Sequence, residues 1–318
     1  MKMNQEWKAE VFQDYKLNPQ GIGRETARQH GVAWSTMFDF KQAIVNGIVT
    51  EENFLTKPKI LLFDIETAPL LVHNWSLWQS YTNLNQVMED WFMLSWAAKW
   101  LDEDEVKSDN IFAHRERFKE DPQDDLVIVE SLYKLIDEAD IIVGHNVRKF
   151  DDKKSRARFL KHGMQMPSPY RKVDTLEIAK REFALASNKL DWLATYLGYE
   201  NKVQHEGHEL WVKCMKGDKE AWKTMMEYNE YDTVLLEKVY RHIRGWSTNH
   251  PNVATYYNDF VARCTNCGST DLEVTGDDVH SNLGKYAAVR CGECGKVSKQ
   301  RTNLLNKRKR DTLLGNFT

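Results

Sequence analysis

Short apolar runs alternate with longer amphipathic stretches through the middle of the chain. Ile60–Phe63 and Ile141–Val143 are continuous apolar runs typical of strands buried on both faces of a sheet, and Trp91–Trp100 predicts a third strand. Helices are expected over residues 124–139, 151–163, 175–183, 189–198 and 218–243. This alternation, between about residues 59 and 246, predicts an α/β domain with a mixed sheet.

The segment before this domain has a different pattern. Residues 1–56 are typical of short helices, in which Ala27 is small enough to let two helices approach and Gly31 permits a turn between them. The apolar residues spaced to fill a shared core are Val32, Met37 and Phe40. The pattern predicts a helix-turn-helix. Whether it reads a nucleic-acid sequence stays open, because the second helix carries Asp39 and only one nearby basic residue, Lys41.

Composition and charge narrow the class of protein. With 42% hydrophobic and 29% charged residues, the chain of 318 residues has the composition of a globular protein and not of a disordered tail. Its apolar runs are far shorter than the ~20 residues of a membrane span, and its N-terminus lacks the apolar core of a signal peptide. We therefore expect no membrane contact and a cytoplasmic location.

The net charge of −3 is unevenly distributed. Residues 101–140 carry 14 acidic and 5 basic residues, whereas residues 141–180 carry 10 basic and 4 acidic ones. Contacts with nucleic-acid phosphates depend on local clusters of lysine and arginine. The near-neutral total therefore does not exclude nucleic-acid binding.

Four of the five cysteines form two pairs. Cys264 and Cys267, like Cys291 and Cys294, are separated by two residues, which lets one turn offer both sulfurs to one ion, and a glycine follows each pair. The spacing predicts a zinc ribbon that holds one structural Zn²⁺. Cys214 stands alone and is expected to be packed in the protein interior.

These patterns divide the chain into four parts. We expect a helical domain over residues 1–56, an α/β domain over 57–247, a zinc ribbon over 248–306 and a basic tail over 307–318. Pro58 lies in the first linker, because proline does not fit inside a central strand. The tail contains Lys307–Arg310, which either form a solvated end or contact nucleic acid.

Acidic residues follow the buried strands of the predicted α/β domain. Asp64 and Glu66 come at the end of the first strand, where the two-residue period directs both side chains to one face. Asp151 or Asp152 stands between the second buried strand and the next helix, and the sequence does not tell which of them turns inward. Carboxylates on an apolar strand repel each other unless a positive charge compensates them, and a divalent cation is the natural compensation.

The last predicted helix carries a tyrosine and another acid. Tyr228 and Asp232 are four residues apart and therefore share one helical face. Their order along the chain, after the acids of the two strands, favours a joint functional role over two unrelated surface residues.

Three stretches carry a resemblance to a known family. Phe63-Asp-Ile-Glu-Thr67, His145-Asn-Val-Arg-Lys-Phe-Asp151 and Tyr228-Asn-Glu-Tyr-Asp232 resemble the motifs of the DEDD, or DnaQ-like, 3′-5′ exonuclease superfamily, in the variant with a tyrosine in its third motif. The histidine variant would have a histidine where Glu227 stands. Residues 169–176 and 189–198 look like a branch related to the proofreading domain of family B DNA polymerases, whose members are frequently encoded by phages.

The resemblance implies an RNase H-like fold and a two-metal mechanism. Asp64, Glu66, Asp151 and Asp232 would hold two Mg²⁺ or Mn²⁺ ions, with Asp64 bridging them. Tyr228 would orient the attacking water, and because an unperturbed phenol has a pKa near 10, hydrogen bonding suits it better than proton abstraction. The residues expected to contact the substrate are Asn146, Lys99, Arg148 and Lys149. Further candidates for phosphate binding are Lys153, Lys154, Arg156 and Arg158.

The resemblance leaves the substrate and the role open. Single-stranded or frayed DNA is the expected substrate, and RNA is the alternative, because such a site tests phosphodiester geometry more than sugar identity. A third interpretation is a nucleic-acid-binding or scaffold protein with a vestigial exonuclease domain, against which the intact acids and Tyr228 argue. A replication or repair protein is the expected protein partner, in a host cytoplasm if the protein is phage-encoded.

Overall fold

The computed structural model describes residues 7–47, 49, 57–79, 81–199, 206–257 and 261–315. The chain forms two compact units, one of Lys59–Ile243 and one of Met1–Pro58 with Arg244–Thr318. The predicted division into four domains stays a prediction, and its limit at residue 56 and the tail residues 316–318 lie outside the described residues. No helix in the described part of the chain combines the length and apolar character that a membrane span needs.

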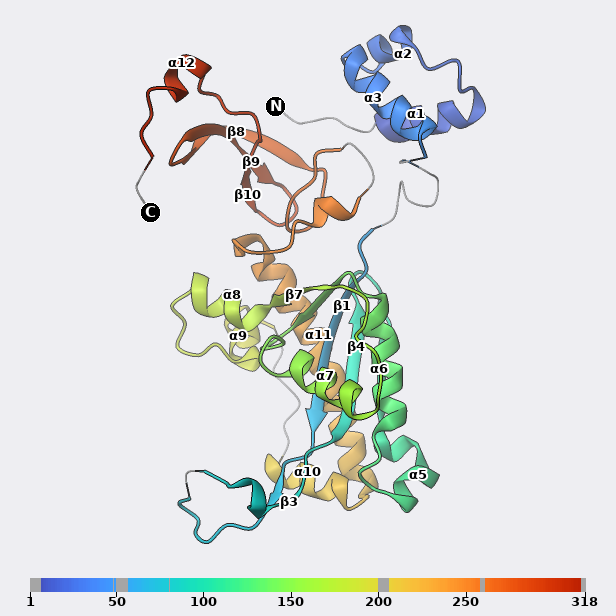
Figure 1. Cartoon of the computed structure of the whole chain (residues 1–318), viewed down its shortest axis with the longest axis vertical. Helices are drawn as coiled ribbons and strands as arrows, with labels where there is room; N and C mark the ends of the chain where they lie inside the picture. The colour runs from blue at the N-terminus through green and yellow to red at the C-terminus, as the bar shows by residue number, and fades with distance from the viewer. Residues whose placement is uncertain are drawn as a thin grey trace. The chain divides into compact units, whose positions relative to one another are not determined.

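The Lys59–Ile243 unit is built on a five-stranded mixed sheet (Figure 1). In sheet order its strands are β5 (Val106–Asn110), β4 (Met93–Trp100), β1 (Ile60–Thr67), β6 (Ile141–Gly144) and β7 (Arg171–Asp174). β1 pairs antiparallel with β4 and parallel with β6, so the two strands predicted from apolar runs are neighbours. The predicted α/β fold with a mixed sheet is confirmed.

Helices lie on both faces of this sheet, with α6 (Leu126–Glu138) on one face and α11 (Lys219–Ile243) on the other. The unit also contains α5 (Arg115–Glu120), α7 (Asp151–Lys161), α8 (Thr175–Glu182), α9 (Leu190–Tyr196) and α10 (His208–Met215). α6 packs against β4 on the face of Trp96, whose indole Nε1 donates to the carbonyl of Ile128 at 2.8 Å. Neighbouring residues of a strand point to opposite faces, so Ile65, paired with Trp96, faces α6, whereas Asp64 faces α11.

The apolar part of β1 is buried on both faces. Leu61, Leu62 and Phe63 are at most 1% exposed, which explains why this strand is continuously apolar. Burial of such side chains contributes about 25 cal/mol per Å² of apolar surface. The strand becomes partly exposed at Asp64 and Glu66, so its polar residues occur where the sheet reaches solvent.

Between β1 and β4 the chain leaves the sheet as an arm, which we define as residues 68–92 (Figure 1). β2 (Leu71–Val72) and β3 (Val87–Glu89) pair antiparallel at its base, and a 3₁₀ turn, η1 (Leu84–Gln86), precedes β3. The sequence pattern did not predict these short strands.

The N-terminal segment contains α1 (Trp7–Leu17), α2 (Arg24–Gln29) and α3 (Trp34–Val45). Ala27, Met37 and Phe40 are at most 1% exposed, and Gly31 has a φ of +65° in the turn between α2 and α3. The predicted helical hairpin and these core residues are confirmed. Lys41 donates from Nζ to a backbone carbonyl of the same segment at 3.0 Å, so the basic residue nearest to Asp39 contributes to the fold.

The C-terminal segment contains an antiparallel sheet of β10 (Val297–Lys299), β9 (Gly284–Cys291) and β8 (Leu272–Ser281), in that order. The 3₁₀ turns η3 (Arg244–Trp246) and η4 (Val253–Tyr256) precede this sheet, and the short helix α12 (Lys307–Arg310) follows it. All four basic residues of α12 are exposed, which leaves both predicted roles of the tail open.

Candidate active site

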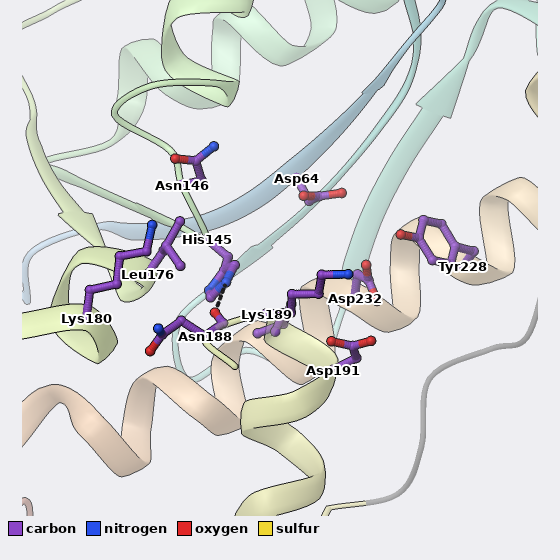
Figure 2. Close-up of a pocket in the computed structure, with 11 residues that line it drawn as sticks. Asp64, His145, Asn146, Leu176, Lys180, Asn188, Lys189, Asp191, Tyr228 and Asp232 are labelled. Atoms are coloured by element: carbon purple, nitrogen blue, oxygen red, sulfur yellow. Dashed lines mark hydrogen bonds between the residues drawn. The ribbon is translucent and has the colours of Figure 1, made fainter. Parts of the chain in front are cut away.

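A cavity of about 640 Å³ lies where β1, the loop after β6, α8, α9 and α11 meet (Figure 2). Asp64 from β1, Asn146 from the loop, and Tyr228 and Asp232 from α11 line it together. Its wall also includes His145, Lys180, Asn188, Lys189 and Asp191. Residues from three stretches that are far apart in sequence therefore share one cavity.

The side chain of Asp64 is held by the neighbouring helix. Asn229 Nδ2 on α11 donates to Asp64 Oδ2 at 2.8 Å, and Ser95 Oγ on β4 donates to Asn229 Oδ1 at 3.1 Å. Asn229 is 0% exposed, so its amide is fixed by packing as well as by these bonds. Glu66 lies two residues further along the same face of β1, opposite Ser95 in the strand pairing. The Asp64 carboxylate is thereby oriented within the protein.

The loop after β6 is held by Asp174, the last residue of β7. Its carboxylate accepts hydrogen bonds from the backbone N–H groups of Asn146 and Arg148, at 3.0 and 3.1 Å, and of Leu176 and Glu177, at 3.1 and 3.3 Å. Asn146 has a φ of +80°, in the left-handed region that asparagine tolerates better than most residues. One buried carboxylate therefore fixes the start of α8 and brings Asn146 to the cavity wall.

Asp151 and Asp152 begin α7, and both are 1% exposed, but they have different partners. Asp152 forms an ion pair with Lys172 and accepts a hydrogen bond from Tyr170. Asp151 turns toward β1, where its Oδ1 accepts a hydrogen bond from the backbone N–H of Ile65 at 3.4 Å. Burial, aided by the charge of neighbouring carboxylates, raises the pKa of Asp151 to about 7. Of the two acids, Asp151 is the one next to the strand that carries Asp64.

Tyr228 and Asp232 extend from the same side of α11 (Figure 2), as their spacing predicts. The Tyr228 ring packs edge-on against Trp211 of α10, with 6.3 Å between ring centroids. Burial raises the pKa of the Tyr228 phenol, and the charges of Asp232, Glu66 and Asp64 raise it further. The phenol therefore keeps its proton at neutral and moderately alkaline pH, and three carboxylates act on it.

The residues around Tyr228 suit a hard divalent cation. Mg²⁺ and Mn²⁺ prefer carboxylate oxygens as ligands. The pKa of Tyr228 is raised by burial and by the negative charge of Asp232, Glu66 and Asp64, and a cation would offset that charge. Asp151 is not among the residues that line the cavity. The donor set therefore fits by its chemistry, although in the part of the chain that the structure describes the compact cluster of metal-ligand atoms is formed by cysteines.

That compact cluster consists of Cys264, Cys267, Cys291 and Cys294, whose sulfurs all lie within 4.8 Å of one another. Cys264 Sγ and Cys294 Sγ are 3.5 Å apart, and Cys267 Sγ and Cys291 Sγ are 3.6 Å apart. A tetrahedral site with Zn–S bonds of about 2.3 Å separates its sulfurs by about 3.8 Å. Gly268 and Gly295, which follow the pairs, have φ values of +76° and +72°, as the motif predicts. The cluster has the composition and size of a structural zinc site.

The residues expected to contact the substrate have different surroundings. Asn146 lines the cavity, Lys149 is exposed, and Arg148 pairs with a glutamate of α8 at 3.1 Å. Lys99 differs from the expectation, because it forms an ion pair with Glu237 of α11 in which the two side chains are 11% and 9% exposed. Lys99 therefore has a partner inside the protein and is not among the residues that line the cavity.

Arg158 corrects the expectation that the basic residues of α7 bind phosphate. It is 2% exposed and pairs with Asp125 at 2.6 Å. The Asp125 carboxylate also lies 2.7 Å from His162 Nε2 and accepts a hydrogen bond from the backbone N–H of Met93 at 2.8 Å. This buried network attaches α7 to α6 and β4. The exposed basic residues of α7 are Lys153, Arg156 and Lys161.

The sequence pattern assigned no role to four polar residues at this site: Asn229, Asp174, Lys180 and Lys189. Asn229 directly follows Tyr228, and Lys189 is the first residue of the stretch 189–198 that looks like the polymerase-related branch. Both residues therefore lie within stretches that the resemblance had already marked. Asp174 acts on backbone amides and Lys180 lies on a predicted helix, and neither position stands out in the sequence.

The match to a known family model agrees with the α/β architecture. Residues 94–244 match the family model described as the RNase_H superfamily, from within β4 to just after α11. Among solved structures, the chain is similar to the family B DNA polymerase from the hyperthermophilic archaeon Pyrobaculum calidifontis, at 17% identity and a TM-score of 0.44. That match covers 65% of this chain and 28% of the polymerase chain. No match was found among curated proteins. The Lys59–Ile243 unit is an α/β domain whose residues 94–244 are similar to the RNase_H superfamily.

Proposed function

We propose that the RNase H-like domain is a metal-dependent nuclease that removes nucleotides from the 3′ ends of single-stranded or frayed DNA. RNase H-like domains are often nucleases, and this supports the general class of reaction. The observation that carries the proposal is the cavity that Asp64 of β1 lines together with Tyr228 and Asp232 of α11. A buried tyrosine among carboxylates from two distant segments suits hydrolysis assisted by divalent cations better than it suits a structural core.

In this proposal Asp64, Glu66, Asp151 and Asp232 hold two Mg²⁺ or Mn²⁺ ions. The ions supply activation of a water and stabilisation of the leaving 3′-oxygen. Asp151 is preferred to Asp152 as a ligand, because the Asp152 carboxylate is already engaged by Lys172. The four cysteines hold one Zn²⁺ with a structural role.

The other residues of the site bind the substrate or position the reacting groups. Asn229 keeps the Asp64 carboxylate oriented, and Asp174 keeps Asn146 at the cavity wall. The neutral Tyr228 phenol donates a hydrogen bond that orients the attacking water and takes no proton from it. Asn146, Arg148 and Lys149 remain the proposed substrate contacts.

A digest of matched DNA and RNA oligonucleotides labelled at the 5′ end tests this function. With added Mg²⁺ or Mn²⁺, we expect the DNA to yield a ladder that shortens one nucleotide at a time, and we expect no ladder without divalent cation. A ladder from RNA alone would instead support an exoribonuclease. Intact DNA and RNA under every metal condition would favour a binding protein with a vestigial domain.

Tyr228→Phe is expected to lower kcat by about 10- to 100-fold, because the ring keeps its packing while the water loses one hydrogen-bond partner. Since the phenol stays protonated, the alkaline limb of the pH–rate profile should be the same in the variant and the wild type. Tyr231→Phe, three residues along α11, is the matched control and should keep full activity. An alkaline limb that moves in Tyr228→Phe would show that the phenol ionises during the reaction.

A further inference from the structure

Within the arm, residues 75–84 present large apolar side chains to solvent. Trp75 is 94% exposed, Trp78 is 91% exposed and Tyr81 is 71% exposed, and Leu77 and Leu84 are exposed to a similar degree. Scattered apolar residues are common on protein surfaces, but three aromatic and two aliphatic side chains within ten positions form a patch that indicates binding.

The inside of the arm is polar. Gln86 is 9% exposed, donates from Nε2 to the carbonyl of His73 at 2.7 Å, and accepts from Gln79 Nε2 and from the backbone N–H of Asn83, both at 3.0 Å. The backbone N–H of Trp75 donates to Gln79 Oε1 at 3.3 Å. Hydrogen bonds of the Gln79 and Gln86 side-chain amides therefore hold the loop together. The side chains of Trp75, Trp78 and Tyr81 lie outside these hydrogen bonds.

Charged residues are absent from most of the arm and occur at its root. Residues 68–88 contain no Asp, Glu, Lys or Arg. At the root of the arm, however, Lys154 of α7 lies 3.3 Å from Thr67 Oγ1 at the end of β1, and its Nζ is 3.9 Å from the centroid of the Trp91 ring. Lys153 and Arg156 of the same helix are exposed. An uncharged aromatic surface thus projects from a root where Lys154 of α7 lies beside Trp91, next to the acidic residues Glu89 and Asp90 of the arm.

We infer that the arm stacks on the bases of an unpaired nucleic-acid strand while the exposed cations of α7 contact its phosphates. Stacking platforms next to a basic track are the usual means of binding single strands without sequence preference. An unpaired strand offers flat, uncharged base faces to Trp75, Trp78 and Tyr81, whereas paired bases hide theirs in the stack. The arm leaves the sheet directly after Asp64 and Glu66, so the inference rests on the proposed function for how the strand reaches it.

Binding can be measured apart from hydrolysis in the full chain carrying Asp64→Asn. A fluorescent single-stranded DNA is compared with a strand of the same length in which every base is replaced by an abasic site, so that phosphates are kept and base faces are lost. The double variant Trp75→Ala/Trp78→Ala should bind the intact strand at least tenfold more weakly. It should bind the abasic strand as tightly as its parent does, because no base faces remain to be stacked.

Two control variants test whether the loss of affinity comes from the aromatic rings of the arm. Trp75→Phe/Trp78→Phe preserves aromatic faces and should retain most of the affinity, and Trp246→Ala removes an exposed tryptophan outside the arm and should have no effect. Equal affinity of the double alanine variant and its parent for the intact strand would overturn the inference and assign the arm to a protein partner. Failure of the wild type to degrade any strand would overturn the proposed function and leave this binding result unaffected.

Discussion

Asp64→Asn is expected to reduce the rate of nucleotide release by at least ~10³-fold, equivalent to about 4 kcal/mol of transition-state stabilisation. The substitution keeps the shape of the side chain and removes the negative charge that a cation needs. The charge also acts on Tyr228, so its loss should bring the phenol pKa closer to its ordinary value. The fold should remain intact, because Asp64 is partly exposed and lies beyond the buried part of β1.

The matched control is Asp191→Asn. Asp191 lines the same cavity but is exposed at the start of α9, so its substitution should change the rate by less than about threefold. Thermal unfolding should show the same stability for both variants and the wild type. An Asp64→Asn protein that folds and degrades DNA at the wild-type rate would show that the Asp64 carboxylate is not an essential metal ligand.

Cys291→Ser is expected to abolish Zn²⁺ binding and to unfold the three-stranded C-terminal sheet. Apart from the cysteines, the buried apolar cluster of this sheet contains only Leu272 and Val289 among the described residues, too little to stabilise it. Binding of Zn²⁺ to four thiolates contributes roughly 10–16 kcal/mol at pH 7 in small zinc domains, which makes folding here depend on the metal. Metal analysis should find one Zn²⁺ per molecule in the purified wild-type chain and none in the Cys291→Ser variant.

Cys214→Ala is the matched control, because it removes the fifth cysteine from a different unit. Burial raises the pKa of Cys214 to about 12, so it offers no thiolate at neutral pH. Its substitution should leave the zinc content at one ion. Zinc that persists in Cys291→Ser with an unchanged fold of the sheet would contradict the assignment of the site.

Much of the fold follows from local patterns in the sequence. The apolar runs of β1 and β6 and the long helix α11 were predicted, because residues buried on both faces or along one helical face leave a regular pattern. β5 and β7 were missed. β5 is only half-buried throughout, and β7 begins with an exposed arginine, so neither has the continuous apolar character that marked the central strands.

The sequence predicted several residues of the candidate site, but it did not predict the residues with which they form ion pairs and hydrogen bonds. Adjacent residues such as Asp151 and Asp152 cannot be ranked from sequence, because their difference depends on Lys172, twenty positions further along the chain. Lys99 looked like a phosphate contact because its partner, Glu237, is 138 positions away. Pairing of this kind depends on tertiary packing and leaves no local signal.

The most direct test of the proposed function is the release of nucleotides from single-stranded DNA labelled on its 3′-terminal residue. With Mg²⁺ present, the label should appear first as a mononucleotide 5′-phosphate, because the proposed water attacks the terminal phosphate and the 3′-oxygen of the shortened strand leaves. Asp64→Asn and the metal-free reaction should release none. Label appearing first in longer fragments, or released equally by Asp64→Asn, would contradict a 3′-5′ exonuclease built on these carboxylates.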